Sequence, residues 1–425
     1  MTRPRIAVIG SGVSGIKAAH MLQARADVTL FEQDSYVGGH TNTEYIERGG
    51  AIWPVNTGFI VYNDWTYPNF IAFMNELGVE NEASSMSFSV RCETSGVEYN
   101  GTSLDTLFAQ RRNVASPGFL RMILDILRFN RELTRASRNG ELSADMTLGD
   151  YLRKGRYSKR FRDHYIIPMG AAIWSCGEAQ MDTFPLAFFA RFFDNHGMLS
   201  VDERPQWRVI KGGSQSYVKA FLKVFTGNVR LNARVTRIDR DASGVTITVN
   251  GGTERFDQVV LACHSDQSLA MLAEPTQAER EILGAIDYLE NDVVLHTDTR
   301  VLPRTPKAWA AWNYRVNGKV NERPSVTYNM NILQNFDCRE TFCVTLNDTG
   351  SIDPARIIKT YRYSHPLYTR EAMGAQQRHA EISGHHRTWY CGAYWFNGFH
   401  EDGVLSGKRA AESLLHHLER EAVHG

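Results

Sequence analysis

Apolar and polar residues alternate in blocks at the start of the chain, and these blocks predict a strand, a helix and a second strand. Ile6 to Ile9 form a short apolar run, residues 14–24 repeat apolar positions at helical spacing, and DVTLFEQD is a second mostly apolar run. This order is the βαβ unit of parallel sheets. We therefore expect an α/β fold with a parallel sheet.

Further along, the pattern predicts an amphipathic helix, an antiparallel meander and a last helix from about Val404. Residues 229–263 alternate apolar and polar positions, with glycine turns between the runs. Residues 117–138 have helical spacing of apolar residues, with arginines among them. The apolar positions are Phe119, Leu120, Ile123, Leu124, Leu127 and Leu133, and the arginines are Arg121, Arg128, Arg131, Arg135 and Arg138. No linker separates the elements, which predicts interleaved domains.

Composition narrows the function classes. The 47 basic and 47 acidic residues give no net charge, which argues against a nucleic-acid-binding surface. No signal-peptide pattern and no apolar run of spanning length is present, so we expect a cytoplasmic protein. None of the six cysteines forms a CxxC pair, which argues against a metal centre.

A glycine-rich turn joins the first strand to the first helix. Gly10, Gly12 and Gly15 have the G-x-G-x-x-G spacing. The first glycine permits a tight turn, the second lets the backbone approach a pyrophosphate, and the third lets the helix pack on the strand. Val13 and Ser14 begin the helix, whose free N–H groups favour an anion. The turn predicts a dinucleotide site.

The acid that such a site needs follows at the end of the second strand. Glu32 lies 22 residues after Gly10, with Gln33 beside it, and can accept hydrogen bonds from an adenosine ribose. These features fit either NAD or FAD. A second glycine pair, Gly38-Gly39, offers N–H groups to the far side of a pyrophosphate. His40, which follows it, is either a further phosphate contact or a polar residue of the surface or core. The second pair favours the longer FAD.

The phrases VIGSGVSG, FEQD and VGGH, with TWYCGAYWFNGFHEDGVLSGKRAAESL near the C-terminus, resemble the amine oxidase, phytoene desaturase and protoporphyrinogen oxidase superfamily. The resemblance implies a glutathione-reductase-like Rossmann domain that binds FAD noncovalently, with an interleaved α+β substrate domain. We expect the FAD-binding domain in residues 1–80, 205–285 and 385–425. The substrate domain would take residues 81–204 and 286–384.

The resemblance also implies further flavin contacts. Gly392 would end a late strand, and the next helix would direct its N-terminus at the pyrimidine edge of the flavin. Ala393 stands where relatives often have an acid, so Asp402 would take over the ribityl contact. The remaining implied contacts are Thr57, Gly58, Phe59, Val235 beside the adenine, Gly403 and Val404.

A narrower resemblance covers nearly the whole chain. NTGFIVYNDWTYPNF, KGGSQSYV, AWNYR and GAYWFNGFHEDG are similar to bacterial flavoproteins that accompany cyclopropane fatty acid synthases, and to the flavin domain of the plant synthases. This implies a lipid or fatty acyl substrate, including methylated chains on the route to furan fatty acids. It also implies a cyclopropane-synthase-type methyltransferase as a partner.

Acyl desaturation sends a hydride to flavin N5 and a proton to a base. His400 and Glu401 lie beside the predicted flavin-binding helix, and His296 lies in the strand DVVLHTDT. Tyr394 begins an aromatic run that would line a substrate channel or pack in the core. No lysine of the kind that amine oxidases often hold near N5 can be placed, which disfavours ordinary amine oxidation.

The sequence thus predicts a FAD-dependent oxidoreductase that desaturates a lipid acyl chain. Two alternatives stay open: an amine oxidase with an acidic pocket, and a non-catalytic flavin-binding partner of a lipid methyltransferase. The arginine-rich helix at residues 119–135 is either a solvated lid face or a surface for anionic headgroups. In the second case the protein would bind peripherally to the inner face of the membrane.

Overall fold

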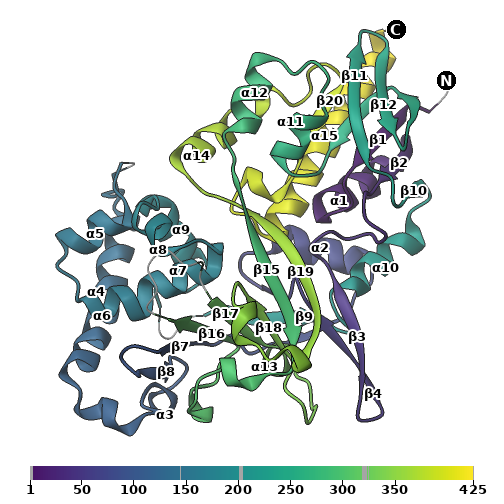
Figure 1. The fold of residues 1–425 in the computed structure, drawn as a ribbon. Coiled ribbons are helices and arrows are strands. Elements are labelled where there is room, and N and C mark those ends of the chain that lie inside the picture. The colour runs from purple at the N-terminus through teal and green to yellow at the C-terminus, as the bar shows by residue number, and fades with distance from the viewer. Residues whose placement is uncertain (1–2, 144, 201–203, 318–322, 324, 425) are drawn as a thin grey trace.

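The computed structural model describes residues 3–143, 145–200, 204–317, 323 and 325–424. In Figure 1 the upper part of the molecule contains both ends of the chain and a parallel sheet, and the lower part contains a larger sheet and a group of helices. Strands β15 (Tyr288–His296) and β19 (Ile357–Pro366) run between the two parts as an antiparallel pair.

Three distant segments of the chain build the parallel sheet. Its strand order is β10-β2-β1-β14-β20, and all neighbouring strands are parallel. The strands are β1 (Arg5–Ile9), β2 (Asp27–Phe31), β10 (Asn228–Arg230), β14 (Gln258–Leu261) and β20 (Thr388–Tyr390). With α1 (Val13–Leu22), strands β1 and β2 form the expected βαβ unit, and the predicted α/β fold class is confirmed.

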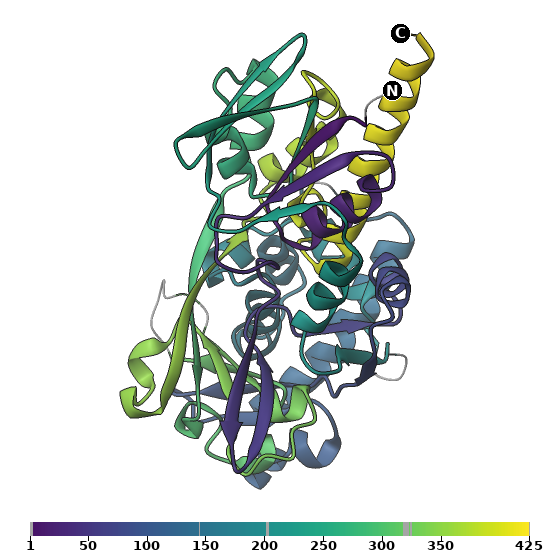
Figure 2. The same ribbon diagram turned by 90° about the vertical axis from the view of Figure 1, so that its right-hand side faces the viewer.

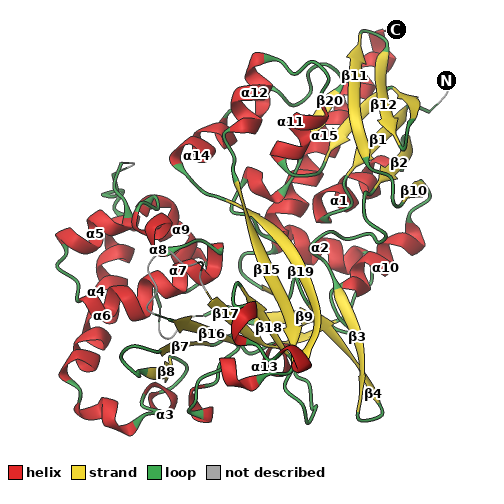
Figure 3. Ribbon diagram, viewed as in Figure 1, coloured by secondary structure: helices red, strands yellow, loops and turns green. Residues whose placement is uncertain are grey.

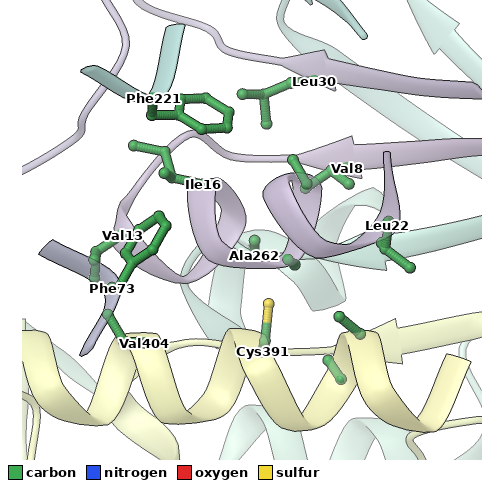
Figure 4. Packing of buried hydrophobic residues seen from close by; sticks show 14 of the residues in the cluster. Val8, Val13, Ile16, Leu22, Leu30, Phe73, Phe221, Ala262, Cys391 and Val404 are labelled. Atoms are coloured by element: carbon green, nitrogen blue, oxygen red, sulfur yellow. The ribbon is translucent and has the colours of Figure 1, made fainter. Parts of the chain in front are cut away.

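The parallel sheet lies between two hydrophobic cores, because alternate residues of a strand face opposite sides. Ile6 and Val8 face the helical side, and Ala7 and Ile9 face the meander. The helices are α1, α2 (Pro68–Glu76), α10 (Gln215–Val224) and α15 (His400–His424); the meander is β11 (Val235–Asp241), β12 (Gly244–Val249) and β13 (Gly252–Phe256). Figure 4 shows the helical side, where Val8, Ile16, Cys391 and Val404 meet.

The first and last helices lie side by side (Figure 2), and glycines of α15 set their distance. A Cβ at Gly403 would lie 2.5 Å from Cγ1 of Val13, and one at Gly407 would lie 2.2 Å from the carbonyl oxygen of Ser14. Larger side chains would therefore push the helices apart. The packing holds the N-terminus of α1 beside the first turn of α15.

The last helix begins at His400, earlier than the sequence predicts. The Asp402 carboxylate accepts a hydrogen bond from the backbone N–H of Phe399 at 2.9 Å. This bond satisfies a donor at the helix start and extends the helix by one turn.

The lower part is built on a sheet with the order β19-β15-β18-β17-β16-β7-β8, in which only β16 and β7 pair in parallel. Its other strands are β7 (Phe88–Cys92), β8 (Glu98–Asn100), β16 (Trp312–Val316), β17 (Ser325–Asn329) and β18 (Cys343–Leu346). Figure 3 shows the helices gathered at its β7–β8 end. They are α3 (Leu104–Leu107), α4 (Pro117–Arg138), α5 (Leu148–Lys154), α6 (Lys159–Phe161), α7 (Ile167–Trp174), α8 (Glu178–Asp182) and α9 (Leu186–Asn195).

Short elements complete the fold. They are the hairpin β3 (Thr43–Arg48) and β4 (Ala51–Asn56), the small sheet β5 (Val61–Asn63), β9 (Trp207–Ile210) and β6 (Asn81–Ala83), and the helices α11 (Ser265–Met271), α12 (Gln277–Gly284), α13 (Met330–Leu333) and α14 (Arg370–Gln377). The strands of the parallel sheet fall in the three ranges expected for the FAD-binding domain, and those of the seven-stranded sheet in the two substrate ranges. The exact domain boundaries stay a prediction. Within the described residues, no helix has the length and apolar character needed to cross a membrane.

Candidate functional site

The glycine turn after β1 has two glycines that the backbone requires and one that faces open space. A Cβ at Gly10 would lie 2.9 Å from the carbonyl oxygen of Ala262, and one at Gly15 would lie 1.9 Å from that of Gly10. A Cβ at Gly12 would meet no atom within 4 Å. The missing side chain of Gly12 therefore leaves room directly in front of α1.

This room has the features of an anion site. Gly12 is the N-cap residue of α1 and no side chain caps the helix, so its first N–H groups point at the open space. The second glycine pair closes the other side: a Cβ at Gly39 would lie 3.4 Å from Cα of Gly12. The N–H of Gly38 donates to Oγ of Ser11 at 3.1 Å, which ties the two glycine segments together.

Glu32 lies at the end of β2 beside this turn and is buried. Its Oε2 accepts from the N–H of Ser11 at 3.0 Å, and its Oε1 accepts from the N–H of Asp34 at 2.9 Å. Because Oε2 also accepts from the Ser11 hydroxyl, Oε1 is the oxygen that keeps capacity for another donor, as a ribose contact needs. The backbone N–H of Ala233 donates to the Glu32 carbonyl, which brings Val235 at the start of β11 close to this end of the sheet. Gln33 is exposed.

His40 belongs to a cluster of three histidines, and the sequence pattern does not point to the other two, His264 and His365. The His40 ring lies 5.4 Å from His365 and 6.3 Å from His264 between centroids, and 4.8 Å from Tyr363. His264 stacks on Tyr288 at 4.3 Å. His264 lies just after β14, and His365 lies near the end of β19. Only the arrangement of these strands in space brings the two residues to His40, so the sequence alone could not reveal the cluster.

The clustered imidazoles are neutral. Burial lowers the pKa of His40 to about 4, and His264 adds to this effect. Burial lowers the pKa of His365 to about 3, and His40 adds to that effect. Burial, with a contribution from His365, lowers the pKa of His264 to about 4. Among the described residues no group of three His, Cys, Asp or Glu side chains could hold a metal ion.

His400 joins the same region from the start of α15. Its ring stacks on Phe59 at 3.5 Å, and its Nε2 lies 2.9 Å from Oγ1 of Thr41. Burial, with a smaller effect from His40, holds the pKa of His400 well below its ordinary value. A neutral imidazole therefore occupies the helix N-terminus, where the partial positive charge of the backbone also disfavours protonation.

The structure gives Glu401 a structural task. Its Oε1 accepts from the N–H and the Nδ2 of Asn69 at 3.2 and 2.6 Å, and its Oε2 accepts from the N–H of Phe70 at 2.9 Å. These groups are at the N-terminus of α2, which Glu401 caps across the fold. We therefore no longer expect Glu401 to accept a proton from a substrate.

His296 lies apart from the other candidates. It ends β15, where its Nε2 is 2.7 Å from Oγ1 of Thr345 and its Nδ1 accepts from the N–H of Asp298 at 3.0 Å. Tyr288, which touches the histidine cluster, begins the same strand, so about 26 Å of extended backbone separates the two residues. This corrects the expectation that His296 is a base near the flavin.

Tyr394 is buried beside the end of β20 rather than in a channel wall. The hydroxyls of Tyr394 and Tyr368 and the indole N–H of Trp395 lack a hydrogen-bond partner among the described residues. A Cβ at Gly392 would lie 2.3 Å from the Tyr394 ring, which explains the glycine. Orphaned polar groups at the junction of β20 and α15 fit a site completed by a bound molecule.

Three more expected contacts, Thr57, Gly58 and Val404, have local structural reasons. A Cβ at Gly58 would lie 2.1 Å from the carbonyl oxygen of His40, so this glycine allows two backbone segments to touch. Oγ1 of Thr57 lies 3.1 Å from the Tyr363 hydroxyl. Val404 is buried in the core. Their contacts to a flavin stay predictions.

A cavity of about 460 Å³ adjoins the imidazoles. His40, Thr57, Gly58, Phe59 and His400 all line it, so the structure brings these five predicted residues together. Arg204 is the only Lys, Arg, Asp or Glu side chain in the lining formed by the described residues. Most other lining residues are apolar or aromatic: Ile60, Val61, Tyr67, Met86, Phe88, Tyr165, Met169, Ile173, Trp174, Phe192, Met198, Trp207, Val293, Trp312, Tyr328, Leu346, Tyr363, Tyr368 and Phe399.

Comparison with known proteins identifies the family. The family model described as flavin-containing amine oxidoreductase matches residues 13–339. The chain belongs to this family. Its cofactor is FAD, as predicted, and the space before Gly12, the Glu32 carboxylate and the orphaned groups by β20 fit that cofactor.

Curated relatives of the family cover part of the chain. A putative flavin-containing monoamine oxidase, AofH, of Mycobacterium tuberculosis is 25% identical over 286 residues, which are 64% of this chain and 59% of AofH. An L-amino-acid oxidase of Siganus canaliculatus is 24% identical over 352 residues, 76% of this chain and 61% of that protein. The chain thus spans about three-fifths of the length of these relatives.

Solved structures show the same fold over nearly the whole chain. A putative protoporphyrinogen oxidase from Exiguobacterium has a TM-score of 0.69 at 15% identity and covers 97% of this chain and 99% of its own. A CLA-producing fatty acid isomerase from P. acnes has a TM-score of 0.67 at 15% identity, and the match covers 98% of this chain and 99% of the isomerase. Cyclohexylamine oxidase from Brevibacterium oxydans has a TM-score of 0.68 at 14% identity, covering 98% and 100%. None of these relatives supports the narrower resemblance to flavoproteins beside cyclopropane synthases, which stays a prediction.

Asp402 gives this region a pH dependence. Burial raises the pKa of Asp402 to about 7, against the opposing hydrogen bonds from Phe399 and Asn397. A carboxyl whose folded pKa is raised stabilises the fold below its unfolded pKa, and this stability is lost as the pH rises through 7. We expect the unfolding free energy of FAD-loaded wild type, relative to Asp402→Asn, to fall by about 3 kcal/mol between pH 5 and 8.

Denaturant unfolding of both proteins across that range measures the difference. The amide keeps an acceptor for the Phe399 N–H, so the helix start should survive in the variant. Parallel stability curves for the two proteins would show that Asp402 is ionised in the folded state at ordinary pH.

Proposed function

We propose that the chain is a FAD-dependent oxidoreductase that dehydrogenates an apolar acyl chain bound in the 460 Å³ cavity. The observation that carries the proposal is the lining of this cavity, which has aromatic and aliphatic walls and no carboxylate or lysine among the described residues. Burial in this cavity stabilises an alkyl chain, because apolar surface leaves water. An ammonium group would be desolvated there without a carboxylate from the described residues to pair with it.

When bound, FAD supplies the acceptor for a hydride. The protein's own share is to hold the chain, to exclude water and to take the proton that leaves the neighbouring carbon. One C–H bond breaks and its electron pair leaves with the hydride. The C–H bond of the neighbouring carbon loses a proton to a group of the cavity, and the electron pair that stays behind forms the double bond. Among the described residues, the lining offers four neutral imidazoles for that proton: His40, His196, His365 and His400.

Hydrogen bonds show which ring nitrogen of His365 carries the proton. The Nδ2 of Asn291 donates to Nδ1 of His365 at 3.0 Å, and the Nδ2 of Asn347 donates to Oδ1 of Asn291 at 2.7 Å. His365 therefore keeps its own proton on Nε2 and acts as a donor. Three rings remain, and of these His40 and His400 are the two that the sequence predicts beside FAD, so we assign the proton acceptor to one of them.

Amine oxidation is the second candidate, because the family and AofH are named for amines. An amine with a long alkyl tail would use the same apolar walls. The experiment is anaerobic mixing of FAD-loaded protein with a methyl-branched acyl phospholipid and, separately, with an alkylamine of equal chain length.

We expect the lipid to bleach the visible flavin absorbance and to lose two hydrogens by mass spectrometry. Bleaching by the amine alone would overturn acyl oxidation in favour of amine oxidation. Bleaching by neither compound would favour a non-catalytic partner of a methyltransferase.

A further inference from the structure

The outer face of α4 carries a stripe of exposed leucines. Leu120, Leu124 and Leu127 are 41%, 62% and 49% exposed. Their spacing of four and three residues places them in one row along the helix. The opposite face, with Phe119, Phe129 and others, is buried in the substrate-domain core. Three leucines in a row on a solvent-facing helix leave an apolar surface without a partner in the described chain.

The same row continues into three arginines toward the end of α4. Arg131, Arg135 and Arg138 are exposed, and none forms an ion pair with an acid among the described residues. The other two arginines of the helix differ, because Arg121 and Arg128 each pair with the buried Asp125 at 3.3 Å. The fold thus uses two arginines internally and leaves the three on the outer row available.

A depression of about 730 Å³ adjoins this row and shares the lining residue Gly197 with the 460 Å³ cavity. Leu127 and the three arginines line it, together with Trp65, which is 48% exposed. The segment after α9 forms its wall: Gly197 lines both the depression and the 460 Å³ cavity. Met198 lines the cavity and Leu199 the depression, so a single stretch of chain separates the two spaces. Asp194 is the one acid of the lining in the described residues.

We propose that the outer row of α4, with Trp65, binds the surface of an anionic phospholipid bilayer. Guanidinium groups pair well with phosphate, leucines enter the boundary between headgroups and acyl chains, and tryptophan favours the same depth. The leucines and the arginines follow one another along the same row of α4, so the apolar and the cationic parts form one continuous surface that can contact a bilayer. The delivery of acyl chains from the bilayer to the cavity past Gly197 rests on the proposed function, but membrane binding itself does not.

Vesicle flotation of the FAD-loaded protein tests the surface without any turnover. The probes are phosphatidylcholine vesicles and vesicles that also contain phosphatidylglycerol. We expect binding to the anionic vesicles only, weakened by salt. The variant Arg131→Gln/Arg135→Gln/Arg138→Gln should bind them about 100-fold more weakly, from roughly a fivefold loss for each arginine. Leu124→Ser/Leu127→Ser should also weaken binding.

Matched controls separate a local surface from general attraction. Arg237→Gln/Arg280→Gln/Arg362→Gln removes the same charge from exposed positions on other elements, and Leu104→Ser removes a leucine that is 77% exposed. Both controls should bind as wild type does. Flavin content and unfolding midpoint, measured on every variant, establish that each is folded.

Three results would overturn the proposal. They are no binding of wild type to anionic vesicles, equal loss in the arginine variant and its control, and binding that does not depend on the leucines or arginines of α4. A stable complex with a purified cyclopropane-synthase-type methyltransferase in place of vesicle binding would assign the face to a protein. Vesicle binding without lipid-driven flavin bleaching would leave the surface in place and reject the proposed reaction.

Discussion

Gly12→Val is expected to abolish FAD binding and to leave the fold intact. The structure separates these two effects, because a Cβ at Gly12 meets no atom within 4 Å and its φ is −62°. A valine can therefore be accommodated by the chain, but its branched side chain fills the space where we predict that the pyrophosphate meets the N-terminus of α1. Loss of that contact, with a steric clash added, should weaken FAD binding by more than 100-fold.

Reconstitution of the apoprotein with FAD, followed by flavin fluorescence and visible absorbance, measures the effect. Gly101→Val is the matched control, since Gly101 also has open space around its Cβ position and no positive φ. The control should bind FAD normally. FAD binding by Gly12→Val at wild-type affinity would place the pyrophosphate elsewhere and remove the basis of the proposed site.

The predictable part of this site is the part that one local segment encodes. The strand, turn and helix from Arg5 to Leu22 follow from apolar runs and glycine spacing, and the structure has them where expected. The amphipathic helix α4 at Pro117–Arg138 also matches, because its pattern repeats over several turns. Glu32 is local as well, since it directly follows the second strand of the same unit.

Contacts between distant segments could not be predicted from the sequence. Glu401 caps α2, more than 300 residues earlier, and only the packing of α15 on α2 brings them together. His296 looks well placed in sequence, but its strand runs on into the lower part of the molecule and takes it away from the site. His264 and His365 stand alone in the sequence and meet His40 because three elements end at one place.

A charge placed in the apolar cavity is expected to slow the reaction strongly. Met169 lines the cavity from α7 and lies among aromatic and aliphatic lining residues. Met169→Glu would put a carboxylate against a bound alkyl chain, where neither group finds a good partner. We expect FAD binding to persist and the rate of anaerobic flavin reduction by the acyl lipid to fall by about 100-fold or more.

The position supplies its own controls. Met169→Leu keeps volume and polarity and should react at nearly the wild-type rate. Met169→Gln, which is uncharged, should fall between the two, so the series separates charge from shape. If the substrate is instead an alkylamine, the new carboxylate would pair with its ammonium group, and Met169→Glu would bind the amine more tightly than wild type does. The sign of that change therefore distinguishes the two candidate reactions at a single residue.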